Sequence, residues 1–129
     1  MVSVDTNVVV RLLVGDDPAQ TRKAERAFLA HARNDGVYVS LVVLAEVGWV
    51  LSSAYEWDRA TLHARISQLI RTRGIVVEEL ELVQRALDDF HQGKADFSDY
   101  LILGKARESG GPLLTFDRKL SRETDARLL

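Results

Sequence analysis

The chain has 129 residues, of which 47% are hydrophobic and 28% are charged, and its formal net charge is −2. This length and composition are typical of one globular domain with a buried core, so we expect a single domain over residues 1–129. The chain has no cysteine, which excludes disulfides and thiolate metal sites. No apolar run approaches the length of a bilayer crossing and no secretory leader is apparent, so we expect a cytoplasmic protein without membrane contact.

Short β-branched runs alternate with helix-forming segments in the first half of the chain. The run at residues 2–4 predicts a buried strand that ends directly at Asp5. Capping patterns mark where helices begin, as at Asp17-Pro18 and at Ser40. The expected elements are a strand at 2–4, helices at 8–14 and 18–33, a strand at 37–39 and a helix at 41–55.

The second half of the chain continues this alternation. Asp58 and Asp96 are expected to cap helices, and the break at residues 110–112 precedes a further buried strand that leads to Asp117. The expected elements are helices at 59–70, 80–92 and 96–108, strands at 75–77 and 113–115, and the remnant of a last strand at 125–129. Because strands that alternate with helices form parallel sheets with right-handed crossovers, this order predicts an α/β fold with a parallel sheet.

Four acidic residues are predicted to meet at one edge of this sheet. Asp5 and Asp117 follow strands at their carboxyl ends, where open parallel sheets bind ligands. Glu46 has apolar neighbours three and four residues away on its helix, and Asp99 heads a similar stripe, so both are expected to face inward. Asp96 lies one turn before Asp99 on nearly the same side. Carboxylates gathered in this way repel one another unless a cation lies among them, and an oxygen-rich site suits Mg²⁺ or Mn²⁺.

Each acid also has a purely structural interpretation. Asp5, Asp96 and Asp117 could each cap the helix or turn that follows, and Asp99 could favour the helix dipole. Glu46 could pair with a buried arginine. The joint pattern nevertheless favours one shared site over several independent explanations.

Four short motifs follow one another in a characteristic order along the chain. They are Val-Asp-Thr-Asn at residues 4–7, a glutamate in the helix after the second strand, Ala-Asp-Phe-Ser-Asp at 95–99 and Leu-Thr-Phe-Asp at 114–117. Together they resemble a PIN domain and, more narrowly, the VapC-type toxins of bacterial and archaeal toxin–antitoxin pairs. The resemblance spans essentially the whole chain. It implies a three-layer α/β/α sandwich with a small central parallel sheet flanked by helices, and a Mg²⁺- or Mn²⁺-dependent endoribonuclease that cleaves tRNA or other structured RNA.

Roles and partners follow from the resemblance, residue by residue. The positions that match the family's catalytic acids are Asp5, Glu46, Asp99 and Asp117. The metal would be held by Asp5 and Asp99 with Asp96 and Asp117, while Thr6, Asn7 and Thr115 match supporting polar residues. The expected partners are a cognate VapB-type antitoxin and a second copy of the chain, in a homodimer and a toxin–antitoxin hetero-oligomer.

Basic residues gather in stretches that suit an RNA substrate. Residues 59–73 contain four arginines and a histidine but no acid, and we expect Arg65 and Arg71 to contact RNA phosphates. Arg118 and Lys119 are alternatives nearer the predicted site, and so is the pair at residues 22–23. The competing interpretation of residues 59–73 is a solvated helix face.

Two rival classes of function fit parts of the sequence. An aspartate-based phosphatase also places an aspartate after its first strand, but such enzymes usually carry a second aspartate two residues on, where this chain has Asn7. A non-catalytic interaction domain is favoured if the acids prove to be dispersed. Rapid hydrolysis of a phosphomonoester without RNA cleavage would identify the phosphatase, and inertness towards both substrates would identify the interaction domain.

Overall fold

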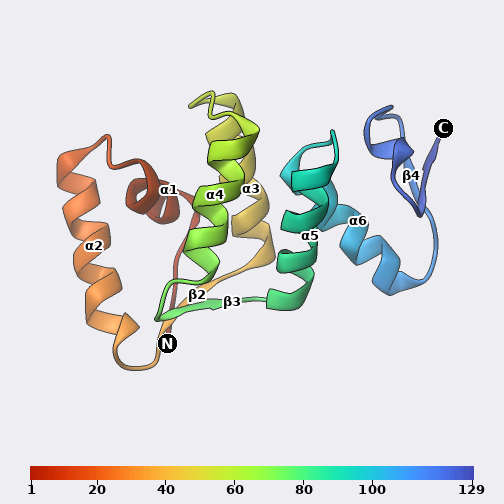
Figure 1. The fold of residues 1–129 in the computed structure, drawn as a ribbon. Helices are drawn as coiled ribbons and strands as arrows, with labels where there is room; N and C mark the ends of the chain where they lie inside the picture. The colour runs from red at the N-terminus through yellow and green to blue at the C-terminus, as the bar shows by residue number, and fades with distance from the viewer.

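The helices and strands occur in the order that the sequence predicts (Figure 1). The computed structural model describes residues 1–129. None of its helices has the length and apolar character that a bilayer crossing requires. The elements are β1 (Val2–Ser3), α1 (Thr6–Val14), α2 (Pro18–Ala32), β2 (Val37–Val39), α3 (Leu41–Ser53), α4 (Arg59–Ile70), β3 (Ile75–Val77), α5 (Leu80–Gln92), α6 (Phe97–Ser109), β4 (Leu113–Thr115), the 3₁₀ helix η1 (Leu120–Arg122) and β5 (Ala126–Leu128).

Three helices begin at the polar caps that the sequence predicts. The side chains of Asp17, Ser40 and Asp58 each accept a hydrogen bond from the backbone N–H three residues further on, at 3.1, 3.2 and 2.7 Å respectively. Each bond satisfies one of the backbone donors that the first turn of a helix leaves free. These boundaries are therefore set by local chemistry.

The strands form two parallel sheets. In the first, the order is β1-β2-β3, with Val2 opposite Val37 and Val37 opposite Ile75. In the second, β4 pairs only with β5, with Leu113 opposite Ala126. This confirms an α/β fold with a small parallel sheet flanked by helices, but β4 does not join that sheet. The expectation that the ends of β1 and β4 share one sheet edge is therefore wrong, because alternation along the chain predicts strand direction and not which strands become neighbours.

The core lies between the three-stranded sheet and the helices. Its fully buried side chains include Val39 on β2, Leu44 and Leu51 on α3, and Ile66 on α4. Helix α3 packs against both α1 and α6. At the contact with α6, a Cβ atom on Gly48 would lie 2.9 Å from the Phe97 ring, so glycine is what allows the two helices to approach this closely.

Two polar side chains tie the segment around residues 93–95 to its surroundings. The buried Tyr100 hydroxyl donates to Glu123 at 2.7 Å and accepts from the Ala95 N–H at 3.3 Å. Burial, followed by the hydrogen bond to Glu123, raises the pKa of Tyr100 to about 12. Glycine at position 93 leaves the room that this hydroxyl occupies.

Arg59 secures the same segment from α4. Its guanidinium donates to the carbonyl oxygens of Ala95, Phe90 and Gly93 at 2.7, 2.8 and 3.1 Å. It also lies 4.1 Å from the centre of the Phe90 ring. The interpretation of residues 59–73 as a solvated helix face is therefore wrong for Arg59.

Candidate functional site

The first group of predicted site residues lies where β1 leads into α1. The Asp5 Oδ1 accepts a hydrogen bond from the Val8 N–H at 3.2 Å and so caps α1. The Thr6 hydroxyl donates to Glu46 Oε2 at 3.1 Å, which joins the start of α1 to the middle of α3. Asn7 is exposed beside them. We call Asp5, Thr6, Asn7 and Glu46 the N-terminal group.

Glu46 lies on the exposed side of α3. Its neighbours Val42 and Trp49 are 67% and 60% exposed, whereas the buried side of the helix carries Leu44 and Val47. The prediction that Glu46 faces inward is therefore wrong. Helix α3 is apolar on almost every side, so the spacing of apolar residues could not determine which side is buried.

The second group surrounds the start of α6 and the end of β4. The half-buried Asp99 accepts a hydrogen bond from the Asp96 N–H at 3.2 Å, as in a capping box. Asp117 Oδ1 accepts from the Leu120 N–H at 3.0 Å, and the Asp117 N–H donates to the Thr115 hydroxyl at 3.0 Å. We call Asp96, Asp99, Thr115 and Asp117 the C-terminal group.

The carboxylates of the C-terminal group influence one another. The pKa of Asp99 is raised, chiefly because the carboxyl is partly buried and also because the charges of Asp96 and Asp117 lie near it. The hydrogen bond from the Asp96 N–H opposes this rise. Asp96 and Asp117 therefore lie near enough to Asp99 for their charges to act on its carboxyl.

The four predicted catalytic acids share one chemical property. Asp5, Glu46, Asp99 and Asp117 each use one carboxylate oxygen in a hydrogen bond and leave the other free. None of them forms an ion pair with lysine or arginine, because all such pairs in the structure involve other acids. Oriented carboxylate oxygens without a cationic partner fit the ligand chemistry of Mg²⁺ or Mn²⁺.

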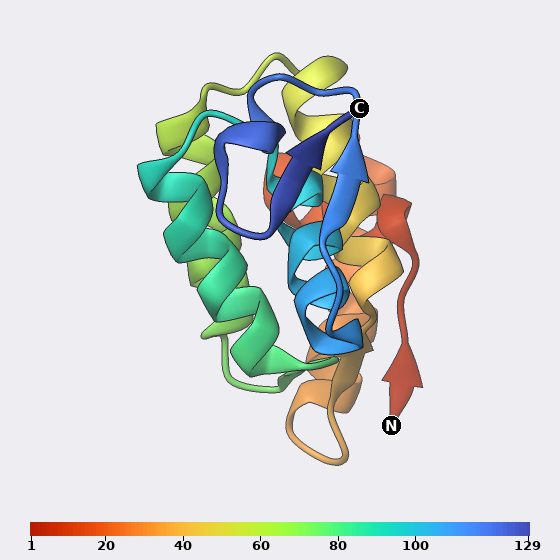
Figure 2. The same cartoon turned by 90° about the vertical axis from the view of Figure 1, so that its right-hand side faces the viewer.

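The spacing of these acids is wider than that of a shared ion site. No three histidine, aspartate or glutamate side chains lie close enough together to hold one metal ion. In Figure 1, β1 lies on one side of α3, and α6 with β4 lies on the other. Figure 2 likewise shows β4 and β5 in front of α6, with β1 at the right-hand edge. The structure thus separates the predicted site into two groups that are linked through α3.

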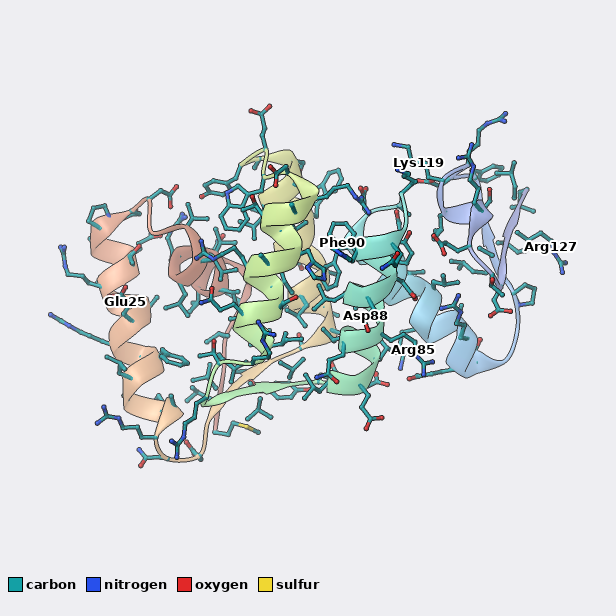
Figure 3. The ribbon with its side chains drawn as sticks, viewed as in Figure 1. Glu25, Arg85, Asp88, Phe90, Lys119 and Arg127 are labelled. Atoms are coloured by element: carbon teal, nitrogen blue, oxygen red, sulfur yellow. The ribbon has the colours of Figure 1, made fainter.

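The basic residues predicted to contact RNA differ in their exposure and in their contacts within the protein. Arg65 donates to the Leu13 carbonyl at 2.7 Å and lies 5.5 Å from the Trp57 ring, so it links α4 to the end of α1. Arg71 is exposed beyond the last turn of α4. Arg118 and Lys119 are exposed in the segment after β4, directly following Asp117, and Figure 3 shows Lys119 at this end of the molecule.

A groove beside Asp5 is a feature that the sequence analysis missed. It has a volume of about 520 Å³ and lies between the β1–α1 segment and α2. Asp5 and Asn7 line it on one side, and Lys23 and Ala27 line it on the other. The only signal in the sequence was the basic pair at residues 22–23. No pattern indicated which side of α2 this pair would occupy.

The fold and these residues define the class of protein: a small α/β domain in which carboxylates without a lysine or arginine partner follow strands β1 and β4. A family model for the PIN domain matches residues 2–124, nearly the whole chain, and the chain therefore belongs to the PIN domain family. PIN domains are generally metal-dependent nucleases. No match was found among curated proteins.

Proposed function

We propose that this protein is a Mg²⁺- or Mn²⁺-dependent endoribonuclease and the toxin of a VapBC-type toxin–antitoxin pair. The observation that carries the proposal is the set of four acids, Asp5, Glu46, Asp99 and Asp117, each with a free carboxylate oxygen and no cationic partner. They occur in a chain of the PIN domain family. The proposed substrate is tRNA or other structured RNA in the cytoplasm. The proposed partners are a cognate antitoxin and a second copy of the chain.

The polar residues of each group hold its carboxylates in defined orientations. Thr6 fixes one oxygen of Glu46, and the Thr115 hydroxyl receives the N–H of Asp117. Asp5 in the N-terminal group and Asp99 in the C-terminal group would be the principal metal ligands, each within its own group, with Asp96 and Asp117 near Asp99. A bound divalent ion lowers the pKa of a water molecule and polarises a phosphate. The protein's contribution is to orient the carboxylates and to position the RNA backbone between the two groups.

The nuclease proposal is tested on purified protein. A labelled tRNA mixture is incubated with the protein in chelator, in Mg²⁺ and in Mn²⁺, and the products are separated on a denaturing gel. We expect discrete internal cuts that require a metal and are absent with Asp5→Asn. A parallel assay with a phosphomonoester covers the rival enzyme. Rapid hydrolysis of the phosphomonoester while the RNA stays intact would contradict the proposal and identify a phosphatase. Inertness towards both substrates would identify a non-catalytic interaction domain.

The toxin role needs a separate test in cells. Induced expression should arrest growth, and Asp99→Asn should not, at equal protein level. Sequencing of RNA ends after induction would identify the cleaved RNA. Co-expression of a small DNA-binding protein encoded by a neighbouring gene should restore growth. Unimpeded growth despite active, soluble enzyme would contradict the toxin role while leaving the nuclease proposal intact.

A further inference from the structure

The groove beside Asp5 follows the open edge of β1. Four successive residues, Val2, Ser3, Val4 and Asp5, line it. Because successive side chains of a strand point to opposite faces, a groove that touches all four runs along the strand's edge. On the edge that faces β2, the N–H groups of Val2 and Val4 donate to the carbonyl oxygens of Gly36 and Tyr38, just before and in β2, at 3.3 and 3.2 Å. The N–H and C=O of Ser3 therefore point to the other edge, which has no strand partner.

The basic side chains that line this groove differ in whether they already have a polar partner within the protein. The Arg11 guanidinium is held by Asp16 at 3.1 Å, Gln20 at 2.6 Å and Tyr55 at 3.1 Å, so its charge is already compensated. His31 lies 3.9 Å from Asp35. Lys23 is exposed and forms no ion pair or hydrogen bond. Lys23 is thus the one fully charged group in the groove that can receive an anion.

The remaining lining suits the sugar and base portions of a nucleic acid strand. Small and apolar side chains cover the wall between Lys23 and the strand, namely Val8, Ala24 and Ala27. Asp5 and Asn7 line the same groove. Outside the groove, the exposed surface of α2 carries Arg22 and Arg26 beside the acid Glu25, and Figure 3 shows Glu25 on the outer side of this helix.

We infer that this groove receives the single-stranded stretch of RNA that leads to Asp5, and that Lys23 binds one of its backbone phosphates. The inference rests on the proposed ribonuclease function and adds to it the path of the substrate. A peptide strand paired with β1 is the competing occupant. Lys23 and Asp5, which line the same groove, favour RNA, because a phosphodiester needs both a cation along its path and a catalytic group beside it.

The first test measures RNA binding without cleavage. A fluorescent single-stranded RNA oligonucleotide is titrated with protein in chelator, and anisotropy is followed at several salt concentrations. We expect Lys23→Gln to weaken binding about three- to tenfold and to reduce the log–log salt slope by about 0.7, the value for one single-strand phosphate contact. Lys23→Arg should restore both. Arg26→Gln is the matched control, since it removes a positive charge from the same helix outside the groove.

The second test locates the RNA and uses the absence of native cysteine. Ala27→Cys places a thiol on the groove wall, and Ala19→Cys places one on the exposed start of α2 outside it. At saturating RNA, we expect the rate of maleimide reaction at position 27 to fall about tenfold or more, and the rate at position 19 to stay unchanged.

The outcomes separate the groove from the enzyme. If the wild type cleaves RNA but Lys23→Gln behaves like Arg26→Gln and position 27 stays reactive, the groove assignment is wrong and the nuclease stands. If a partner protein protects position 27 and RNA does not, the groove binds a peptide strand and the inference is overturned. If the wild type neither binds nor cleaves RNA, both proposals fail.

Discussion

The two parallel sheets of this protein differ in how well the rest of the chain covers them. Val37 and Val39 in the three-stranded sheet are almost completely buried. In the two-stranded sheet, Leu114 of β4 is 53% exposed, and Phe116, directly after this strand, is 81% exposed. Two short strands have little stability of their own. Asp5 therefore follows a strand that pairs with a buried central strand, whereas Asp117 follows a strand whose position depends on contacts outside its two-stranded sheet.

A few polar contacts from α6 and α5 supply that support. Arg107 donates to the Thr124 carbonyl at 2.8 Å and forms ion pairs with Asp125 at 3.2 Å and Asp89 at 3.3 Å. The hydrogen bond from Tyr100 to Glu123 adds a second attachment. Asp117 is thus positioned by these polar contacts together with the buried Leu120, whose N–H donates to it, whereas Asp5 leads directly into the buried residues Val9 and Val10 of α1.

The largest expected effect tests whether the two groups serve one reaction. Asp5→Asn in the N-terminal group and Asp99→Asn in the C-terminal group should each reduce the rate of RNA cleavage about a hundredfold or more, equivalent to about 2.7 kcal/mol of activation free energy. Single-turnover cleavage in Mg²⁺ measures this. Asp88→Asn, an exposed acid on α5 without an ion pair, is the matched control. Full activity in either group's variant would show that this group lies outside the active site.

The second effect concerns metal binding and is measured by thermal unfolding. A ligand at a hundredfold excess over its Kd stabilises the folded state by about 2.7 kcal/mol, so Mg²⁺ should raise the melting temperature of the wild type by several degrees. Because the folded-state pKa of Asp99 is raised, its ionised form is disfavoured in the fold, and this lowers stability as pH rises through that pKa. Asp99→Asn should therefore melt higher than wild type in chelator at neutral pH and gain little from Mg²⁺. A wild type indifferent to both Mg²⁺ and Mn²⁺ would contradict the metal site.

The third effect concerns the helix contact that links the two groups. Gly48→Ala should destabilise the protein by about 1–3 kcal/mol, because the new methyl group would lie 2.9 Å from the buried Phe97 ring. Chemical denaturation measures the change in unfolding free energy. Adding Phe97→Leu should recover part of the loss by making room. Equal stability of wild type and Gly48→Ala would show that α3 and α6 are not tightly packed there.

Local patterns in the sequence predicted most of the elements because each depends on neighbouring residues. The β-branched runs at 37–39 and 75–77 are strands, and Ser40 caps α3 as expected. The motifs also single out the candidate acids, which remain a prediction. Their placement could not be predicted, because the partners of β4 are chosen by tertiary packing. The Arg59 contacts were equally hidden, since their acceptors lie more than 30 residues away along the chain.

The smallest expected effect is a pH dependence remote from both groups. His63 on α4 and His91 on α5 have ring centres 4.6 Å apart. Burial, and then the charge of His91, lower the pKa of His63, while Asp88 opposes the shift. Because the folded-state pKa of His63 is lowered, the fold favours the neutral imidazole. The stability that this preference contributes is complete above the ordinary pKa of 6.5 and is lost as pH falls through the folded-state pKa. His63→Gln should make the melting temperature depend less on pH between pH 7.5 and 5.5, by roughly a degree, and thermal unfolding at several pH values measures this.

The contact between Gly93 and Tyr100 has a consequence for how the sequence can vary. Gly93 has a φ of −99°, which every amino acid can adopt, so only the neighbouring side chains restrict the position. A Cβ atom there would overlap the Tyr100 hydroxyl and lie 2.6 Å from a Glu123 oxygen. Replacing tyrosine by phenylalanine removes the hydroxyl and releases Glu123 from its bond. Positions 93, 100 and 123 should therefore change together among related chains, with larger residues at 93 accompanied by the loss of the tyrosine–glutamate pair.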